Sequence, residues 1–413
     1  MADKLVRLGL GLVVWLWLAR QFGPEAFGTW NFAIAYAALF ASVSTLGLDG
    51  VVQRELVQNR GPLPSVVGTA LVLRLAAGTT MALLCVLSAL SFWHPDGLVL
   101  ALVACNAAVL PLQSFQVIEY YFQSRMLAKP AVLAAIAAFL ALSAARLWML
   151  REGAPLQYFG ISLVAEAALY GALLLLACRM SGLRLHTVQF DRVIARRLLS
   201  ESWPLLLSGI AVMIYMRIDQ VMLSSLTGDR SVGQFSAALR VSEVWYFMPL
   251  ALVTAAFPAM LDKRAAQPQD YERHLQRLYD LMAWIGIVAA LLFTVYADRV
   301  ISVLYGPEYE EAAAVLRVQT WAGVAVAMSY VHGKWLIGEG LQRLGLIYTV
   351  TGCAVNLGLN ALLIPRFGAL GAAWATLFTQ VGLLPMQLLF PSARRNFVLM
   401  MKALAAPVRL LGQ

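Results

Sequence analysis

The sequence predicts an all-α polytopic membrane protein. Of its 413 residues, 61% are hydrophobic and 13% are charged, and the mean hydropathy is +0.74. A soluble protein is about 45–50% apolar and about 25% charged, so this chain has more apolar side chains than its own core can bury. That excludes a soluble enzyme, a disordered regulator and a nucleic-acid-binding domain. At about 20 residues per membrane-spanning helix plus a short loop, the length accommodates about a dozen spans.

Twelve apolar runs, separated by polar residues or by proline and glycine, meet this expectation. They fall at 5–22, 27–47, 65–90, 97–122, 130–150, 157–178, 203–224, 232–256, 281–298, 312–337, 344–364 and 369–390. The first run follows Lys4 and Arg7 as a signal peptide would. No small-residue cleavage site follows it, so we expect a retained first helix.

The distribution of lysine and arginine predicts which loops face the cytoplasm, because cytoplasmic loops are enriched in these residues. One set of loops holds twenty of them and the other holds only five, namely Arg20, Arg151, Arg230, Arg299 and Arg366. Both termini fall on the basic side and are predicted to be cytoplasmic. Membrane topology therefore accounts for most of the net charge of +9, and no nucleic-acid partner is needed to explain it.

Six spans on either side of a basic segment predict two lobes. The predicted domains are an N-terminal six-helix lobe at 1–178, a cytoplasmic amphipathic linker at 179–201, a C-terminal six-helix lobe at 202–391 and a cytoplasmic tail at 392–413. The linker combines basic and apolar residues in the way that is typical of a helix lying at a membrane surface. The tail has a similar composition and is a candidate for a further membrane-associated helix.

A short internal repeat supports the two-lobe arrangement. The pattern Gly-x4-Gly-x-aromatic-x2-Ala begins at Gly23 and again at Gly228. Each copy lies in the outward turn between the first two spans of its half. Because six spans precede the second copy, both halves enter the membrane in the same direction. The sequence therefore predicts parallel repeats related by an axis along the membrane normal, which is an architecture of alternating-access transporters.

Ionisable residues inside spans are costly unless they face a cavity or a partner. The cations inside the predicted spans are Arg74, Arg146, Arg217, Arg240, Arg317 and Lys334, and the acids are Glu119, Glu166, Asp219 and Glu243. Glu119, Arg146 and Lys334 lie near helix ends, where their side chains can reach the membrane surface. The surplus of cations favours an anionic substrate, since guanidinium binds phosphate through two parallel hydrogen bonds.

Four of these charges lie at similar depths in the seventh and eighth spans. Arg240 and Glu243 are three residues apart and share a helix face, whereas Arg217 and Asp219 point to largely opposite sides. We expect the four groups to meet between the two spans. An interhelical salt-bridge cluster and an anion or ion-coupling site both fit this pattern.

Four segments resemble one family of transporters. They are LARQFGPEAFGTWNFA (Leu18–Ala33), RIDQVMLSSLTGDRSVGQFSAALRVSE (Arg217–Glu243), LYGPEYEEAAAVLRV (Leu304–Val318) and NLGLNALLIPRFGALGAAWATLFTQ (Asn356–Gln380). They are similar to Wzx-type oligosaccharide (O-antigen or polysaccharide) lipid flippases, in the polysaccharide transporter family of the MATE-like multidrug/oligosaccharidyl-lipid/polysaccharide (MOP) superfamily. The resemblance implies a MATE-like fold of two six-helix lobes.

The resemblance also implies a function. A flippase of this family moves an undecaprenyl-diphosphate-linked oligosaccharide, which is an O-antigen or other surface polysaccharide repeat unit. The oligosaccharide crosses from the cytoplasmic to the periplasmic leaflet of the bacterial inner membrane by ion-coupled alternating access. The expected ligands are this glycan and membrane lipids, and polysaccharide polymerase machinery is a further expected partner. No organic cofactor and no metal are expected. The coupling ion is expected to be H⁺, with Na⁺ as the alternative.

Site residues follow from that implication. The candidates for binding diphosphate or sugar are Arg54, Arg74, Arg217, Arg240 and Arg317, with Arg54 at the cytoplasmic mouth. The candidates for ion coupling are Asp219, Glu243 and Glu166. Further candidates for sugar contact, with helix packing as the alternative for each, are Asn106, Gln113, Gln116, Tyr215 and Tyr246.

Three other functions are the alternatives. A MATE-type multidrug or cation antiporter shares the fold, but the first span has no acid in its core. A peptidoglycan-precursor flippase is not separated by sequence from an O-antigen carrier. A polyprenyl-dependent membrane glycosyltransferase needs a catalytic constellation, and Glu308, Glu310 and Glu311 have no accompanying histidine. The sequence therefore predicts a transporter and not an enzyme.

Overall fold

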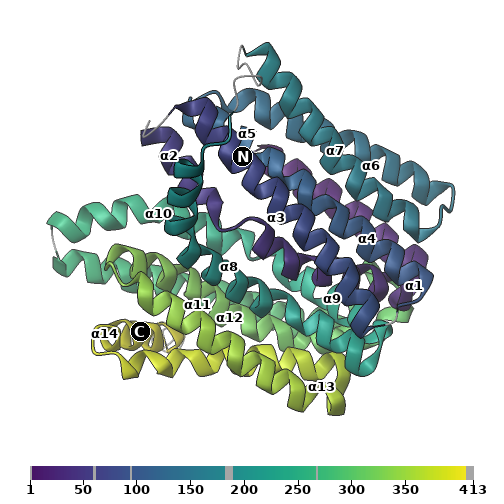
Figure 1. The fold of residues 1–413 in the computed structure, drawn as a ribbon. Coiled ribbons are helices and arrows are strands. Elements are labelled where there is room, and N and C mark those ends of the chain that lie inside the picture. The colour runs from purple at the N-terminus through teal and green to yellow at the C-terminus, as the bar shows by residue number, and fades with distance from the viewer. Residues whose placement is uncertain (1, 59–61, 94, 182–188, 267, 406–413) are drawn as a thin grey trace. The chain divides into compact units, whose positions relative to one another are not determined.

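A computed structural model of the chain describes residues 2–58, 62–93, 95–181, 189–266 and 268–405. All regular secondary structure in these ranges is helical (Figure 1), which confirms the predicted all-α class. The helices are α1 (Ala2–Ser44), α2 (Leu48–Gln58), α3 (Leu63–Phe92), α4 (Gly97–Leu112), α5 (Gln116–Ser124), α6 (Ala128–Arg151), α7 (Leu156–Met180), α8 (Arg192–Thr227), α9 (Asp229–Val244), α10 (Phe247–Ala266), α11 (Pro268–Leu304), α12 (Glu310–Gly338), α13 (Gln342–Met386) and α14 (Arg394–Leu404).

Ten helical segments of the described residues are long and apolar enough to cross a membrane. Two of them bend at a glycine whose φ is positive, a conformation that only glycine adopts at low cost. Gly23 (φ 74°) divides α1, and Gly368 (φ 54°) divides α13. Counting both arms of these two helices yields the twelve predicted spans, with the breaks between 22 and 27 and between 364 and 369 as expected.

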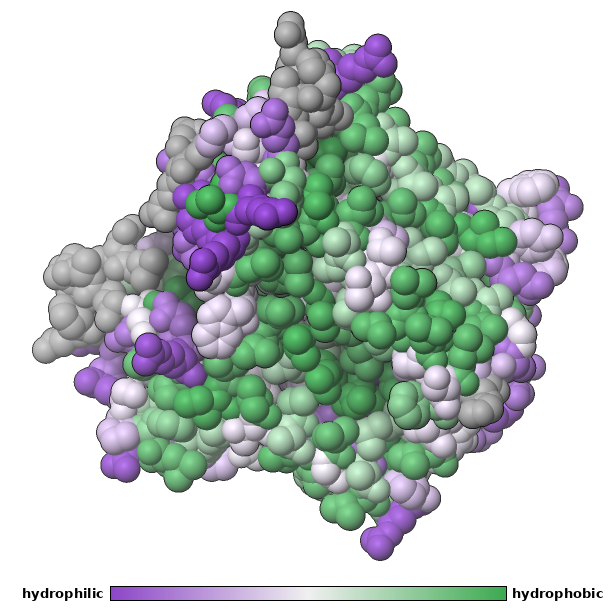
Figure 2. All heavy atoms as spheres, in the orientation of Figure 1, coloured by the Kyte–Doolittle hydropathy of each residue, from purple (hydrophilic) through white to green (hydrophobic). Residues whose placement is uncertain are grey.

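The outer faces of the helices suit a lipid environment. Large apolar side chains remain exposed along them, for example Leu83 (60%), Leu133 (65%) and Leu292 (54%). Figure 2 shows apolar side chains covering the middle of the visible face, with hydrophilic side chains gathered toward its margins. In water this much apolar surface would drive association, so the chain is a multi-pass membrane protein.

Three local features differ from the predicted elements. The fourth predicted span is not one helix, because Pro111 lacks a backbone donor and a 3₁₀ turn at Gln113–Phe115 separates α4 from α5. The eighth is interrupted between Val244 and Phe247. The predicted linker at 179–201 is not a separate helix within its described part: Arg192 to Glu201 form the first turns of α8, and 182–188 lie outside the described residues.

Two short helices lie outside the twelve spans. α2 follows the second arm of α1, and α14 follows α13. α14 packs against α11 and buries Asn396, Leu399, Met400 and Ala403. Eleven residues of helix span about 16 Å, too little to cross a bilayer, so the tail contributes a helix that lies against the protein.

The described chain divides into two compact units. The first contains Met1–Phe22 and Thr29–Val221, and the second contains Gly23–Gly28 and Met222–Gln413. The short segment Gly23–Gly28, which opens the first copy of the repeat, therefore groups with the second unit. The sidedness of the termini stays a prediction.

Within the second unit the two copies of the repeat cross at their glycines. A Cβ atom on Gly28 would lie 1.7 Å from the carbonyl oxygen of Asp229, and one on Gly233 would lie 1.8 Å from the carbonyl oxygen of Pro24. The sixth residue of each copy thus meets the second residue of the other. This reciprocal contact explains why both copies need glycine at the same position.

Side chains next to the crossing are fully buried. Gln234 donates a hydrogen bond to the carbonyl oxygen of Glu308 (2.8 Å) and accepts one from the backbone N–H of Ala312 (2.9 Å). The ring of Phe27 packs against those of Tyr305 and Tyr309, with centroids 6.4 and 6.1 Å away. These contacts hold the start of α12 against both copies of the repeat.

Candidate functional site

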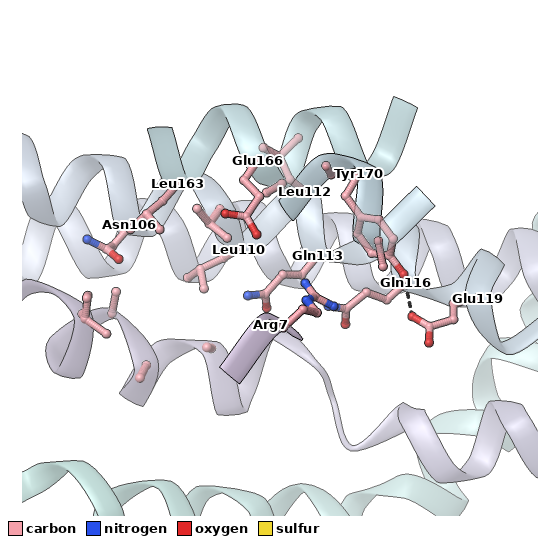
Figure 3. A pocket seen from close by; sticks show the side chains of 18 of the residues that line it. Arg7, Asn106, Leu110, Leu112, Gln113, Gln116, Glu119, Leu163, Glu166 and Tyr170 are labelled. Carbon is pink, nitrogen blue, oxygen red and sulfur yellow. Dashed lines mark hydrogen bonds between the residues drawn. The ribbon is translucent and has the colours of Figure 1, made fainter. Parts of the chain in front are cut away.

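A cavity of about 630 Å³ lies among α1, α4, α5, α6 and α7 of the first unit (Figure 3). Alanine makes up just over half of its apolar lining: Ala37, Ala38 and Ala41 from α1, Ala131, Ala135 and Ala138 from α6, and Ala167 from α7. Because alanine side chains are short, packed helices lined with them leave space between their axes. The sequence therefore creates room here inside an otherwise apolar bundle.

One wall of the cavity carries carboxamide side chains. Asn106, Gln113 and Gln116 all line it, and their spacing of seven and three residues places them on one face of the α4–α5 segment. A carboxamide both donates and accepts hydrogen bonds, which matches the hydroxyl groups of a sugar. All three were predicted from the sequence as candidates for sugar contact, and the structure brings them together.

Two carboxylates, Glu119 and Glu166, line the same cavity, and both have partners. Glu119 accepts hydrogen bonds from the Tyr170 hydroxyl (2.6 Å) and from the side-chain amide of Gln123 (2.9 Å). Glu166 forms an ion pair with Arg146 at 2.7 Å. Arg146 is 9% exposed. The expectation that Arg146 reaches the membrane surface is therefore wrong, because Glu166 on the neighbouring helix neutralises it in the interior.

Arg7 is the one cation among the described residues that line this cavity. Its guanidinium lies 5.1 Å from the centre of the Phe139 ring, within the range of a cation–π contact. Figure 3 shows the guanidinium beside the amides of Gln113 and Gln116. Sequence reasoning counted Arg7 only as a topology residue; its place within the first apolar run was the available signal for a functional role.

Arg74 does not line the cavity but contacts a residue that does. It is 2% exposed and lies 3.0 Å from a carboxylate oxygen of Asp49. It also donates longer hydrogen bonds to Tyr120 (3.5 Å) and to the side-chain oxygen of Gln116 (3.4 Å). The geometry therefore makes Arg74 a support for Gln116.

Arg54 and its neighbour Glu55 connect α2 to the start of α8. Arg54 forms an ion pair with Glu201, and Glu55, which is 1% exposed, forms one with Arg197 at 2.9 Å. Arg197 and Glu201 are one helical turn apart, so the two pairs are adjacent and have opposite polarity. Arg54 is half-exposed and therefore accessible to an anion.

The remaining predicted site residues fall in different parts of the chain. Arg317 on α12 forms an ion pair with Asp298 on α11 and stays partly exposed. Arg217 and Asp219 belong to α8 in the first unit, and Asp219 is 8% exposed. Arg240 and Glu243 belong to α9 in the second unit and are half-buried. Their predicted meeting joins residues of both units and stays a prediction.

Metal ligation has no support within the described ranges. Among those residues, no three histidine, cysteine, aspartate or glutamate side chains come together as metal ligands. What the cavity offers is a row of amides, one guanidinium and two partnered carboxylates. These groups can exchange hydrogen bonds with a polar molecule.

The described residues combine a helical membrane fold with a cavity inside the first unit that polar side chains line, and solved transporters have the same fold. An inward-facing multidrug resistance MATE family transporter of the MOP superfamily has a TM-score of 0.73, with 15% identity and 96% of each chain covered. The inward closed structure of the lipid II flippase MurJ has a TM-score of 0.72, with 13% identity, covering 98% of this chain and 90% of that one. The predicted MATE-like fold is confirmed.

A sequence comparison shows the family to which the protein belongs. The model of the family described as "Polysaccharide biosynthesis protein" matches residues 2–262, which is well over half of the chain. The protein belongs to this family. A second model, MatE, matches residues 204–362.

Curated relatives are distant. The chain is 27% identical over 186 residues to a probable flippase, AglR, of Haloferax volcanii, covering 42% of this chain and 37% of that protein. It is 25% identical over 183 residues to a probable low-salt glycan biosynthesis flippase, Agl15, of the same organism, covering 44% and 39%. The matched region thus spans less than two-fifths of these relatives.

Proposed function

We propose that the protein is a flippase that moves a lipid-linked oligosaccharide across the membrane by alternating access. The observation that carries the proposal is the amide-lined cavity of about 630 Å³ in the first unit, with Arg7 among its polar groups. Membership of the polysaccharide biosynthesis family supports a glycan substrate. Two matched relatives are named as probable flippases, and these names support the same transport step.

Two kinds of side chain in the cavity bind the two parts of the head group: carboxamides bind the sugar, and Arg7 binds the phosphate. The carboxamides of Asn106, Gln113 and Gln116 exchange hydrogen bonds with sugar hydroxyls, replacing the water that the sugar loses on entering the membrane. Arg7 pairs with a phosphate oxygen, and this charge-assisted bond is the strongest single contact available there. The polyprenyl tail stays in the bilayer, so only the head group crosses the polar space.

In its specific form, the substrate is an undecaprenyl-diphosphate-linked O-antigen or other surface polysaccharide unit, moved outward across a bacterial inner membrane. Arg54 on α2 is an exposed contact for the diphosphate, because its surface pair with Glu201 is worth only about 0–1 kcal/mol and exchanges readily for phosphate. Arg217, Arg240 and Arg317 complete the proposed path. Arg74 acts indirectly, because its hydrogen bond to Gln116 positions that side chain.

Ion coupling is assigned to carboxylates, with H⁺ as the ion and Na⁺ as the alternative. Glu166 is paired with Arg146 beside the cavity, so a proton on Glu166 would release Arg146 toward an incoming anion. Glu119 also lines the cavity, and it was not among the predicted coupling residues. Asp219 and Glu243 remain candidates for the same role.

A cation antiporter of the MATE type is the second candidate. The MatE model matches residues 204–362, and the cavity contains two carboxylates against one arginine. In that case the carboxylates, and not Arg7, would bind the transported molecule.

Replacement of Arg7 distinguishes the two candidates. In proteoliposomes with a fluorescent polyprenyl-diphosphate oligosaccharide, Arg7→Gln should slow flipping by about tenfold or more, because a charge-assisted hydrogen bond contributes about 1.5–3 kcal/mol. The control is Arg125→Gln, since Arg125 is exposed and lies outside the cavity. If Arg7→Gln and Arg125→Gln flip the oligosaccharide equally fast, the assignment of Arg7 fails.

A further inference from the structure

A second cavity lies in the second unit, at the place where α14 packs. It has a volume of about 430 Å³, within the roughly 300–1,000 Å³ of small-molecule sites. Its polar and aromatic lining comes from α11, α12 and α14: Tyr271, Glu272, Trp335, Glu339, Arg395 and Asn396. None of these residues has a part in the function proposed above.

Buried hydrogen bonds hold the walls of this cavity in place. Asn396 on α14 is 1% exposed. It accepts a hydrogen bond from the Tyr279 hydroxyl (2.9 Å) and donates to the side-chain oxygen of Gln387 (3.0 Å). His332 lies 2.9 Å from the Asn396 amide and stacks on Trp335, with centroids 5.6 Å apart. α14 is therefore a fixed wall of a formed cavity.

One end of the cavity favours a cation. Glu339 lies at the C-terminal end of α12, where the helix dipole adds negative potential to the carboxylate. Glu339 lines the cavity, and one of its carboxylate oxygens accepts a hydrogen bond from the Tyr271 hydroxyl (3.2 Å). The rings of Trp335 and Tyr271 supply π faces, which attract ammonium groups.

The other end of the cavity has an exposed cation. Arg395 forms an ion pair with Glu272, and the Arg395 side chain is 79% exposed. Arginine stays protonated in proteins, so Arg395 is charged at any physiological pH. Arg394 is its neighbour on α14 and is also exposed. A phosphate can therefore bind at this mouth while the ammonium end of the same molecule lies inside.

The surroundings point to a lipid as the source of such a molecule. Leu389 (73%) and Val398 (45%) stay exposed beside the basic residues of α14, and a helix end with adjoining basic and apolar side chains is typical of a membrane interface. The charge distribution of the sequence predicts that this side of the protein faces the cytoplasmic leaflet. Acyl chains can lie along this apolar surface while the head group enters the cavity.

We propose that the cavity between α11, α12 and α14 binds the headgroup of a zwitterionic phospholipid, with its ammonium group at Glu339 and its phosphate at Arg395. The wholly anionic headgroup of phosphatidylglycerol has no ammonium to offer Glu339 and is repelled by Glu272 and Glu339. The inference does not rest on the proposed transport function, since it uses a different cavity and different residues.

The test measures lipid bound to the purified full-length protein by native mass spectrometry. Micelles contain equal amounts of phosphatidylethanolamine and phosphatidylglycerol, and we expect about tenfold more of the first to remain bound, as one charge-assisted contact provides. Equal retention of both lipids would overturn the proposal. This comparison uses the unaltered protein, so it needs no variant to fold.

Variants then locate the site. Glu339→Gln should lower retained phosphatidylethanolamine about tenfold without lowering retained phosphatidylglycerol, because the variant also removes one of the charges that repel the second lipid. Glu311→Gln, at the opposite end of α12 and exposed, should retain both lipids as the unaltered protein does. Equal loss of both lipids in Glu339→Gln, or no loss, would contradict the assignment of Glu339. Soluble glycerophosphoethanolamine at millimolar concentration should leave the bound lipid in place; if it displaces the lipid, the site recognises the free headgroup and the lipid assignment fails.

Discussion

The crossing of Gly28 with Asp229 allows a sharp test of how the repeats pack. A Cβ added to Gly28 would lie 1.7 Å from the Asp229 carbonyl oxygen, while contacts closer than 3.0 Å are essentially never seen for a real Cβ. The two backbones must therefore separate by at least about 1.3 Å in Gly28→Ala. A carbonyl group cannot rotate away as a flexible side chain would, so the whole crossing has to move.

The net effect is a balance of two terms. Alanine is favoured over glycine by up to about 1 kcal/mol in a helix, whereas forced overpacking costs about 1–3 kcal/mol or more. Gly28 is surrounded by buried residues, so the steric term should win and Gly28→Ala should lower the free energy of unfolding. Gly233→Ala should do the same, because its contact with Pro24 is equivalent.

Unfolding of the purified protein in detergent, followed by intrinsic fluorescence, measures the effect. The control is Gly358→Ala in α13, where an added Cβ has nothing within 4 Å, and this variant should be neutral or slightly stabilised. The double variant Gly28→Ala/Gly233→Ala should lose less stability than the two single losses combined, because one separation relieves both contacts. If Gly28→Ala is as stable as Gly358→Ala, the reciprocal crossing is refuted.

Two further predictions concern ion pairs and α14. Arg197→Gln should destabilise the protein by about 2–3 kcal/mol, because it removes the ion-pair partner of the buried Glu55 carboxylate. This loss is below the usual cost of breaking a buried pair, since Arg197 is partly exposed. Arg54→Gln should cost below about 1 kcal/mol, because its pair with Glu201 is at the surface. Chemical denaturation compares them, and equal losses would contradict the assigned burial. Asn396→Leu removes the bonds to Tyr279 and Gln387, so hydrogen exchange should rise in 394–404; unchanged protection there would show that apolar packing alone holds α14.

Hydropathy predicted most of the fold because lipid exposure requires long apolar helices with few alternatives. Gly23 and Gly368 lie between predicted apolar runs, and α1 and α13 bend at these residues. α2 was missed because it is short and follows an apolar run without a clear break. The repeat singled out Gly28. How closely its backbone approaches that of Asp229 depends on tertiary packing, which no local sequence pattern encodes.

The candidate site was less predictable because its partners are distant in sequence. Arg54 and Glu201 are 147 residues apart, so their pairing is invisible to helical spacing rules. Arg146 looked like a residue near a helix end, yet Glu166 on the next helix neutralises it. Arg7 looked like a topology signal, since a basic residue near the start of a first span usually is one. The sequence shows which residues are charged, but it does not show which partners surround each charge in the folded protein.

The central claim is that the protein transports a lipid-linked glycan and not a free cation. The most direct measurement reconstitutes the purified chain in vesicles that contain a polyprenyl-diphosphate oligosaccharide in one set and a fluorescent organic cation in another. We predict ion-gradient-dependent flipping of the oligosaccharide that Gln113→Leu/Gln116→Leu abolishes and Arg125→Gln preserves, together with no gradient-driven movement of the cation. Gradient-driven cation efflux with no movement of the oligosaccharide would contradict the account.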